Sequence, residues 1–227
     1  MNKLNFPKWL NIYLHRPFPR RIKEFKHAMI SYSQFGEDLL AQELVGYDRN
    51  DIFYIDIGAF HPIIKSNTYI FYQRGGSGIC IEPNPAARLL WRRSRPRDTF
   101  VGKGVIGAGS SLITYRSNSA SAATNHLLKN KSQTNKGDLQ IECTNIGQIL
   151  KDHLPPGRPV DVLSIDCEGI DMDIVRTCPF ESVRPRVAII EDSDYSEKSE
   201  ISSLMHANGY KTVSYAKISK LFVDSQE

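Results

Sequence analysis

Two acidic residues of this 227-residue sequence stand where apolar runs end, and their spacing predicts a nucleoside site. The run 52–58 ends with Asp56 and Gly58, and the run 78–82 ends with Glu82. A glycine at such a point lets the backbone turn tightly and lets a ligand approach it. A carboxylate that ends the next strand can accept hydrogen bonds from both hydroxyls of a ribose. The pattern is typical of one nucleoside-binding half of an α/β fold.

The glycine pattern argues against a site for a pyrophosphate. A G-x-G-x-x-G turn would need glycines where Phe60 and Ile63 stand. Gly102, Gly104 and Gly107 do match that spacing, but they overlap an expected strand and lead into another strand-like segment. We therefore expect S-adenosylmethionine as the cofactor, because it carries adenosine but no phosphate. A nicotinamide-dependent oxidoreductase and a non-catalytic nucleoside-binding module remain alternatives.

Strands and helices that alternate along the chain must position these residues. Apolar runs predict buried strands, and apolar residues at helical spacing predict helices between them. The expected strands are 52–58, 78–82, 99–106, 111–116, 141–144, 160–166, 187–190, 210–215 and 220–223, and the expected helices are 34–45, 66–74, 86–94, 145–152, 170–177 and 196–208. The order predicts a doubly wound, mostly parallel α/β sheet that ends in an antiparallel hairpin. Residues 117–138 are polar and are expected to form a long loop.

The charge is uneven along the chain and divides it at residue 30. Residues 1–30 carry seven Lys and Arg against one acid, whereas the remainder carries 22 basic and 24 acidic residues. We expect a basic N-terminal extension, 1–30, and one domain, 31–227. The extension either packs on the domain or contacts an anionic surface. The slightly acidic domain does not look like a nucleic-acid binder, and the arginines at 88, 92, 93, 95 and 97 are expected to form a solvated helix face.

The cysteines indicate a reducing compartment. They stand at positions 80, 143, 167 and 178 and form no C-x-x-C pair. Reduced thiols are typical of cytoplasmic proteins, and we expect that location. No stretch approaches the roughly 18 unbroken apolar residues of a membrane-spanning helix, and the N-terminus does not resemble a secretory signal.

Five short blocks of the sequence resemble the FkbM family of S-adenosylmethionine-dependent methyltransferases. They are Ser33–Asp38, Asp56–Ala59, Ser66-Asn67, Ile81–Pro85 and Leu163–Gly169, and the resemblance runs from about residue 31 to 223. It implies a class I methyltransferase (Rossmann-like) fold with the strand order 3-2-1-4-5-7-6. The implied activity is O-methylation, often of sugar, glycan or polyketide hydroxyls. The pair His61-Pro62 departs from the family pattern, in which many relatives carry a small or polar residue before a glycine.

The resemblance also implies which residues bind the cofactor. The turn of Asp56, Gly58 and Ala59 would lie beneath the methionine moiety, and Glu82 would bind the ribose. Residues expected at the adenine end, near the methionine amino group or folded over the cofactor are Asn84, Lys103, Gly104, Asp166, Asn67, Gln34 and Glu37.

Methyl transfer to a hydroxyl is an in-line displacement, in which the enzyme mainly aligns the acceptor and removes its proton. The candidate catalytic residues are His61, Asp166, Glu168 and Glu191. Asp166 and the pair Glu191-Asp192 end neighbouring expected strands, so a Mg²⁺ or Ca²⁺ site there is an alternative to metal-free catalysis. Asp171 and Asp173 are expected to be structural, because acids stabilise the first turn of a helix. The acceptor is expected to be a small molecule or a glycan.

Overall fold

The computed structural model describes residues 28–116, 126–127 and 138–226. Residues 1–30 and 31–227 form two separate compact units. The structure below is that of the second unit. The expected contact of the basic N-terminal extension with an anionic surface lies outside the described residues, as does most of the polar segment 117–138.

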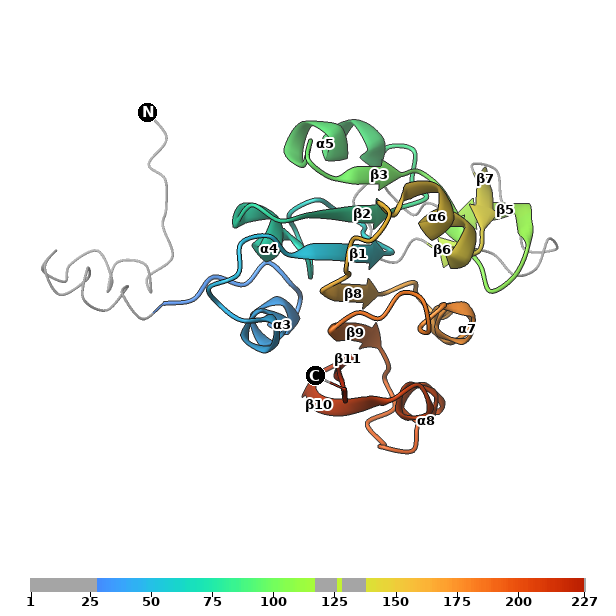
Figure 1. Ribbon diagram of the computed structural model, residues 1–227. Coiled ribbons are helices and arrows are strands. Elements are labelled where there is room, and N and C mark those ends of the chain that lie inside the picture. Colours follow the sequence, from blue (N-terminus) through green and yellow to red (C-terminus); the bar gives the residue numbers. More distant parts are fainter. Residues whose placement is uncertain (1–27, 117–125, 128–137, 227) are drawn as a thin grey trace, which may run out of the picture. The chain divides into compact units, whose positions relative to one another are not determined.

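A seven-stranded sheet forms the centre of this unit (Figure 1). Its parallel strands are β1 (Phe53–Ile57), β2 (Ser77–Ile81), β3 (Thr99–Val101), β8 (Val162–Ile165) and β9 (Val187–Glu191), and its antiparallel hairpin is β10 (Tyr210–Ala216) and β11 (Ser219–Asp224). The strand order is β10-β11-β9-β8-β1-β2-β3, with β11 antiparallel to β9. When the seven strands of this sheet are numbered along the chain and read from the β3 edge, their order is 3-2-1-4-5-7-6. The predicted fold class and the terminal hairpin are therefore confirmed.

Helices cover both faces of the sheet because its strands are apolar on both sides. All five residues of β1 are buried, which fits a strand that lies between two helical layers. On one face Tyr54 packs in a cluster with residues of α3 (Glu37–Val45), α4 (Tyr69–Gln73) and α5 (Ala87–Ser94). On the other face Ile55 and Ile57 pack in a cluster with α6 (Ile146–His153), α7 (Asp171–Thr177) and α8 (Glu200–Ala207).

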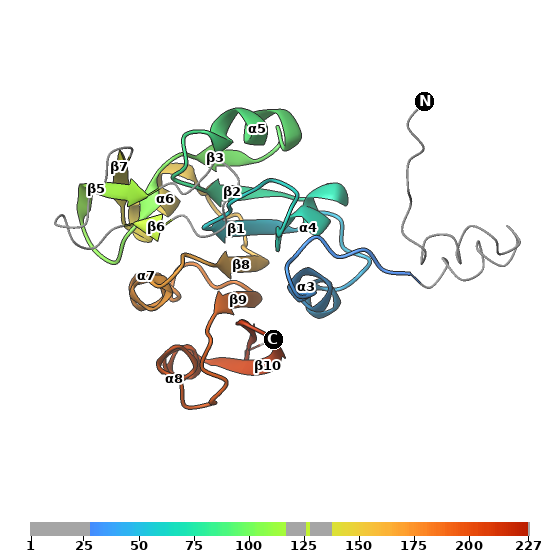
Figure 2. The same ribbon diagram turned by 180° about the vertical axis from the view of Figure 1, so that it is seen from behind.

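A second sheet lies beyond the carboxyl ends of β1 and β2, beside α6, in both views (Figures 1 and 2). Its order is β4-β7-β5-β6, and its strands are β4 (Gly104–Val105), β5 (Ser110–Arg116), β6 (His126–Leu127) and β7 (Leu139–Thr144). The prediction of one strand over residues 99–106 is therefore wrong. Strand β3 ends at Val101, after which the chain leaves the main sheet, and Gly104 and Val105 pair with β7. Within the described residues, no helix is long and apolar enough to cross a membrane.

Candidate functional site

The site is centred on the point where the strand order reverses, between β1 and β8. Gly58 follows β1 with φ of 78°, and a Cβ atom at this position would lie 1.8 Å from the carbonyl oxygen of Asp166. The N–H groups of Gly58 and Ala59 both donate to the carbonyl oxygen of Ile81, each at 3.0 Å. The glycine thus lets the ends of three neighbouring strands come together. The backbone of Asp166 fills the space next to Gly58 that a side chain would otherwise need.

Glu82 ties the loop after β1 to the loop after β2. Its side chain is buried, and it accepts hydrogen bonds from the N–H groups of Phe60 (2.9 Å) and Asn84 (2.7 Å). These two bonds fix the orientation of the carboxylate. Phe60 has a left-handed backbone with φ of 46°, a conformation that is strained for a non-glycine residue and is often found at functional sites. Asn84 is buried, and its side chain accepts from the N–H of Ala86 in the turn before α5.

The Asp56 side chain lies on the face of the sheet that α4 covers. It is 4% exposed, accepts a hydrogen bond of 2.5 Å from the Thr68 hydroxyl, and has its pKa raised by burial. Next to it, the Asn67 side-chain amide donates to the Ser164 hydroxyl of β8 at 3.1 Å. These contacts fasten the segment before α4 to β1 and β8, so Asp56 and Asn67 support the loop between β1 and α4.

The segment that precedes α3 is organised by Asp38. This buried carboxylate accepts hydrogen bonds from the Ser31 hydroxyl (2.6 Å), the Tyr32 N–H (2.7 Å) and the Ser33 hydroxyl (2.8 Å). The segment also contacts the loop between β1 and α4, because the Ser66 N–H donates to the Tyr32 carbonyl oxygen at 3.0 Å.

Of the two contacts expected in this segment, only Gln34 is exposed. Glu37 is buried and accepts a hydrogen bond from the Phe35 N–H at 2.7 Å, so its carboxylate already has an internal partner.

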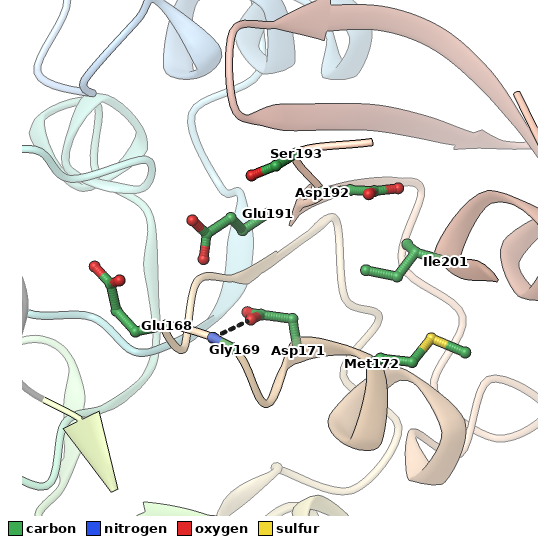
Figure 3. Close-up of a pocket in the computed structure, with 8 residues that line it drawn as sticks. All are labelled: Glu168, Gly169, Asp171, Met172, Glu191, Asp192, Ser193 and Ile201. Atoms are coloured by element: carbon green, nitrogen blue, oxygen red, sulfur yellow. Dashed lines mark hydrogen bonds between the residues drawn. The ribbon is translucent and has the colours of Figure 1, made fainter. Parts of the chain in front are cut away.

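A cavity of about 300 Å³ opens beyond the carboxyl ends of β8 and β9 (Figure 3). It is lined by Glu168, Gly169, Asp171, Met172, Glu191, Asp192, Ser193 and Ile201. The carboxylates of Glu168 and Glu191 extend toward the same open space in Figure 3. The lining is therefore strongly acidic on one side and apolar where Met172 and Ile201 lie.

Asp166 and Glu191 stand at the ends of the neighbouring strands β8 and β9, where their carboxyl groups influence one another's ionisation. Burial, and then the Glu191 charge, raise the pKa of Asp166 to about 8. Burial, and then the charges of Asp171 and Glu168, raise the pKa of Glu191 to about 7. Two carboxyl groups in such contact do not both ionise easily, so near neutral pH the pair retains about one proton.

The loop after β8 is held by Asp171. Its buried carboxylate accepts hydrogen bonds from the N–H groups of Cys167 (2.7 Å) and Gly169 (3.0 Å), which confirms its expected structural role. Glu168 lies between them with a left-handed backbone, φ 51°. The strained conformation directs the exposed Glu168 side chain to the cavity (Figure 3).

Asp192 lies apart from the Asp166 and Glu191 pair. Its carboxylate accepts from the Lys220 ammonium at 2.9 Å and from the Ser199 hydroxyl at 2.6 Å, and Figure 3 shows its side chain directed away from Glu191. The three acids suggested as an alternative metal site therefore do not converge. In the part of the chain that the structure describes, no group of three His, Cys, Asp or Glu residues is placed to hold a metal ion.

His61 is half-buried in the loop between β1 and α4. Its Nδ1 atom accepts hydrogen bonds from the N–H groups of Ile63 (3.0 Å) and Ile64 (2.9 Å), and burial lowers its pKa. This places the ring proton on Nε2 and leaves no lone pair directed at a ligand. The geometry favours a structural role for His61 over that of a general base.

Two of the residues expected at the adenine end, Lys103 and Gly104, lie where the chain passes from the main sheet to the second sheet. The Lys103 ammonium pairs with the Glu142 carboxylate at 2.6 Å, and Gly104 is buried in β4. The break in the expected third strand thus places both residues at the start of the second sheet.

The sequence analysis missed Thr68, Ser164 and Arg95. The expectation that Arg95 belongs to a solvated face is wrong, because it follows the last turn of α5 and is 1% exposed. Its guanidinium donates to the Asp98 carboxylate at 2.6 Å and to the Thr68 hydroxyl at 3.1 Å. Asp98, three residues further on, was the available sequence signal for this inward turn.

A family model described as the methyltransferase FkbM domain matches residues 56–212. Comparison with curated protein sequences finds no match. Among solved structures, an FkbM methyltransferase from Methylobacillus flagellatus is similar at 11% identity and a TM-score of 0.46, over 77% of this chain and 44% of that one. The chain thus spans less than half of that protein's length.

Two further similar structures have a bound cofactor or product in the crystal. Aeropyrum pernix fibrillarin, in complex with S-adenosyl-L-methionine, is 12% identical with a TM-score of 0.43, over 84% of this chain and 73% of that one. The 1,6-didemethyltoxoflavin-N1-methyltransferase of Burkholderia thailandensis, with bound S-adenosylhomocysteine, is 10% identical with a TM-score of 0.41, over 98% of this chain and 91% of that one.

Proposed function

Because the chain belongs to the FkbM methyltransferase family, we propose that it transfers a methyl group from S-adenosylmethionine to a hydroxyl of a saccharide or similar polyhydroxylated acceptor. The choice of a hydroxyl is supported by the two neighbouring carboxyl groups of Asp166 and Glu191 beside the cavity, whose pKa values are both raised. A sugar hydroxyl is a weak nucleophile at neutral pH and needs a base, whereas an uncharged amine does not.

The residues at the ends of β1 and β2 suit the cofactor. Glu82 is held by two backbone N–H groups, which prearranges a carboxylate for the two ribose hydroxyls. The turn at Gly58 and Ala59 would face the methionine moiety, with Asn84 and the Lys103-Gly104 segment at the adenine end. The bound cofactor supplies a methyl group on a positively charged sulfur, and the acidic residues of the cavity favour that charge.

Glu191 is the group best placed to take the proton of the acceptor. It lines the cavity, whereas Asp166 lies behind it at the end of β8. The shared proton of the pair leaves one carboxylate oxygen ionised, and the charges of Asp171 and Glu168 make that oxygen more basic. As the acceptor oxygen gains the methyl group, its proton passes to the Glu191 carboxylate. Asp166 holds the remaining proton of the pair and orients Glu191.

Calorimetry with S-adenosylhomocysteine, followed by turnover measurements on hydroxyl acceptors, tests the two halves of the proposal. We expect Glu82→Gln to weaken binding of S-adenosylhomocysteine by about tenfold or more, because an amide accepts fewer hydrogen bonds. We expect Glu191→Gln to bind it normally and to lose about 10²- to 10⁴-fold in turnover.

Two results would contradict the proposal. Failure of the unaltered chain to bind S-adenosylhomocysteine, with NADH bound instead, would favour the oxidoreductase alternative. Full turnover by Glu191→Gln would remove Glu191 as the base, while leaving the cofactor assignment intact.

A further inference from the structure

Helix α5 has an exposed face of three arginines and two leucines. Arg88, Arg92 and Arg93 are exposed, and the exposed fractions of Leu89 and Leu90 are 56% and 42%. At 100° per residue these five side chains occupy one continuous side of the helix. The opposite side, with Ala87 and Trp91, is buried against the sheet. In Figures 1 and 2, α5 forms the outer boundary of the unit at its β3 edge.

The charge of this face is not neutralised. The segment 83–97 has no acidic residue. Its two other arginines have inward partners, since Arg95 pairs with Asp98 and Arg97 lies 3.8 Å from the centre of the Tyr72 ring. By contrast, within residues 28–116, 126–127 and 138–226, none of the three exposed arginines forms a salt bridge.

We infer that this face of α5 binds an anionic lipid surface. A helix that combines aliphatic and cationic side chains on its exposed side can insert the former among acyl chains while the latter contact phosphates. Leu89 and Leu90 favour a membrane over a nucleic acid as the partner, because a nucleic-acid backbone has no apolar part for these two side chains to contact. The N-terminal extension is an unsuitable cover for this face, because residues 1–30 are themselves strongly basic.

The test is co-sedimentation of the full chain with vesicles of phosphatidylcholine, alone or mixed with phosphatidylglycerol. We expect binding only to the mixed vesicles. The triple variant Arg88→Gln, Arg92→Gln, Arg93→Gln should partition about 100-fold more weakly, since each cation near an anionic surface contributes roughly a factor of five. The double variant Leu89→Ser, Leu90→Ser should partition about tenfold more weakly.

A matched control changes three exposed lysines elsewhere, Lys151→Gln, Lys198→Gln and Lys211→Gln, which alters the net charge equally. We expect this control to bind mixed vesicles nearly as the unaltered chain does. All variants retain residues 1–30 and should bind S-adenosylhomocysteine with unchanged affinity, which shows that they are folded.

Three outcomes would overturn the inference. Equal weakening by the lysine control would mean that charge alone, not this face, determines binding. Unchanged binding of the arginine variant would assign the contact to another part of the chain, such as residues 1–30. The chain could also bind an RNA or DNA duplex instead of the vesicles. If the triple arginine variant lost that binding while the Leu89→Ser, Leu90→Ser variant kept it, the face would be assigned to nucleic acid.

Discussion

Asp166 and Glu191 end adjacent parallel strands, and their carboxyl groups influence one another's ionisation next to the cavity. Their pKa values are both raised, so the number of protons bound to the pair changes near neutral pH. Function and stability should both depend on pH through this pair.

Turnover should rise with pH through an apparent pKa near 7. Glu191 must be ionised to accept a proton, and burial with nearby acids raises its pKa to about 7. Glu168→Gln removes one of the charges that raise this pKa, so the acid limb of the pH profile should move to lower pH, by less than about one unit. The profile of kcat/KM measures this directly. An unmoved limb in Glu168→Gln would show that another group titrates.

Asp166→Asn should stabilise the protein at pH 8 more than at pH 5. The pKa of Asp166 rises from 3.8 to about 8 on folding. The stability associated with its protonated form is therefore fully present below pH 3.8 and is lost as pH rises through 8. The amide cannot ionise, so it escapes this loss, and we expect a gain of at least about 1 kcal/mol at the higher pH. Urea unfolding at both pH values checks the sign; an equal effect at both would contradict it.

Gly58→Ala should destabilise the fold severely. The added methyl would overlap the Asp166 carbonyl oxygen at 1.8 Å, and φ of 78° is unfavourable for alanine. We expect a cost of about 3 kcal/mol or more. Gly157→Ala is the matched control, because Gly157 has φ of 72° but open space around it, so only the backbone strain of about 1 kcal/mol should appear. Equal losses in denaturant unfolding would show that the contact with Asp166 is unimportant.

Arg95→Met should cost about 3–5 kcal/mol, because it leaves the buried Asp98 carboxylate without its ion-pair partner. Arg92→Met, on the exposed side of α5, should change stability by less than about 0.5 kcal/mol. Thermal unfolding of the two variants compares them. A small effect at position 95 would mean that the Tyr54 hydroxyl and the Gly78 N–H, which also donate to Asp98, are enough to hold its charge.

His61→Ala should weaken cofactor binding without moving the pH profile. The lone pair of Nδ1 holds the N–H groups of Ile63 and Ile64, so its loss should loosen the loop between β1 and α4, which we propose to contact the cofactor. If His61 were the general base, its removal would abolish the rise of turnover on the acidic side of the pH profile. Calorimetry with S-adenosylhomocysteine and the pH profile of turnover separate the two roles.

The main sheet could be predicted from the sequence because its strands are local apolar runs. Runs such as Val162–Ile165 are buried on both faces, and the alternation with helices determines the α/β class. The second sheet could not be predicted in this way. β4 has two residues, and it exists because Gly104 and Val105 pair with Cys143 and Thr144, far along the chain.

The candidate site was only partly predictable for a related reason. Residue type and position showed that Glu82, Asp166 and Glu191 stand at strand ends, where ligands bind in this fold. They did not show which neighbour each acid contacts. Asp192 follows Glu191 directly but pairs with Lys220, a residue of β11 whose side chain is fully buried. The assignment of cofactor and catalytic contacts to individual residues remains a prediction.

The hydrogen bond from Ser66 to Tyr32 joins the first residues of the folded unit to the loop between β1 and α4. Tyr32 also packs edge-on against Tyr69 at 4.8 Å, and its hydroxyl donates to Gln73. Movement of the opening segment would thus disturb α4. By thermodynamic reciprocity, we expect a ligand that rigidifies the loop to protect residues 31–38 from proteolysis, and cleavage in that segment to lower the affinity for the ligand.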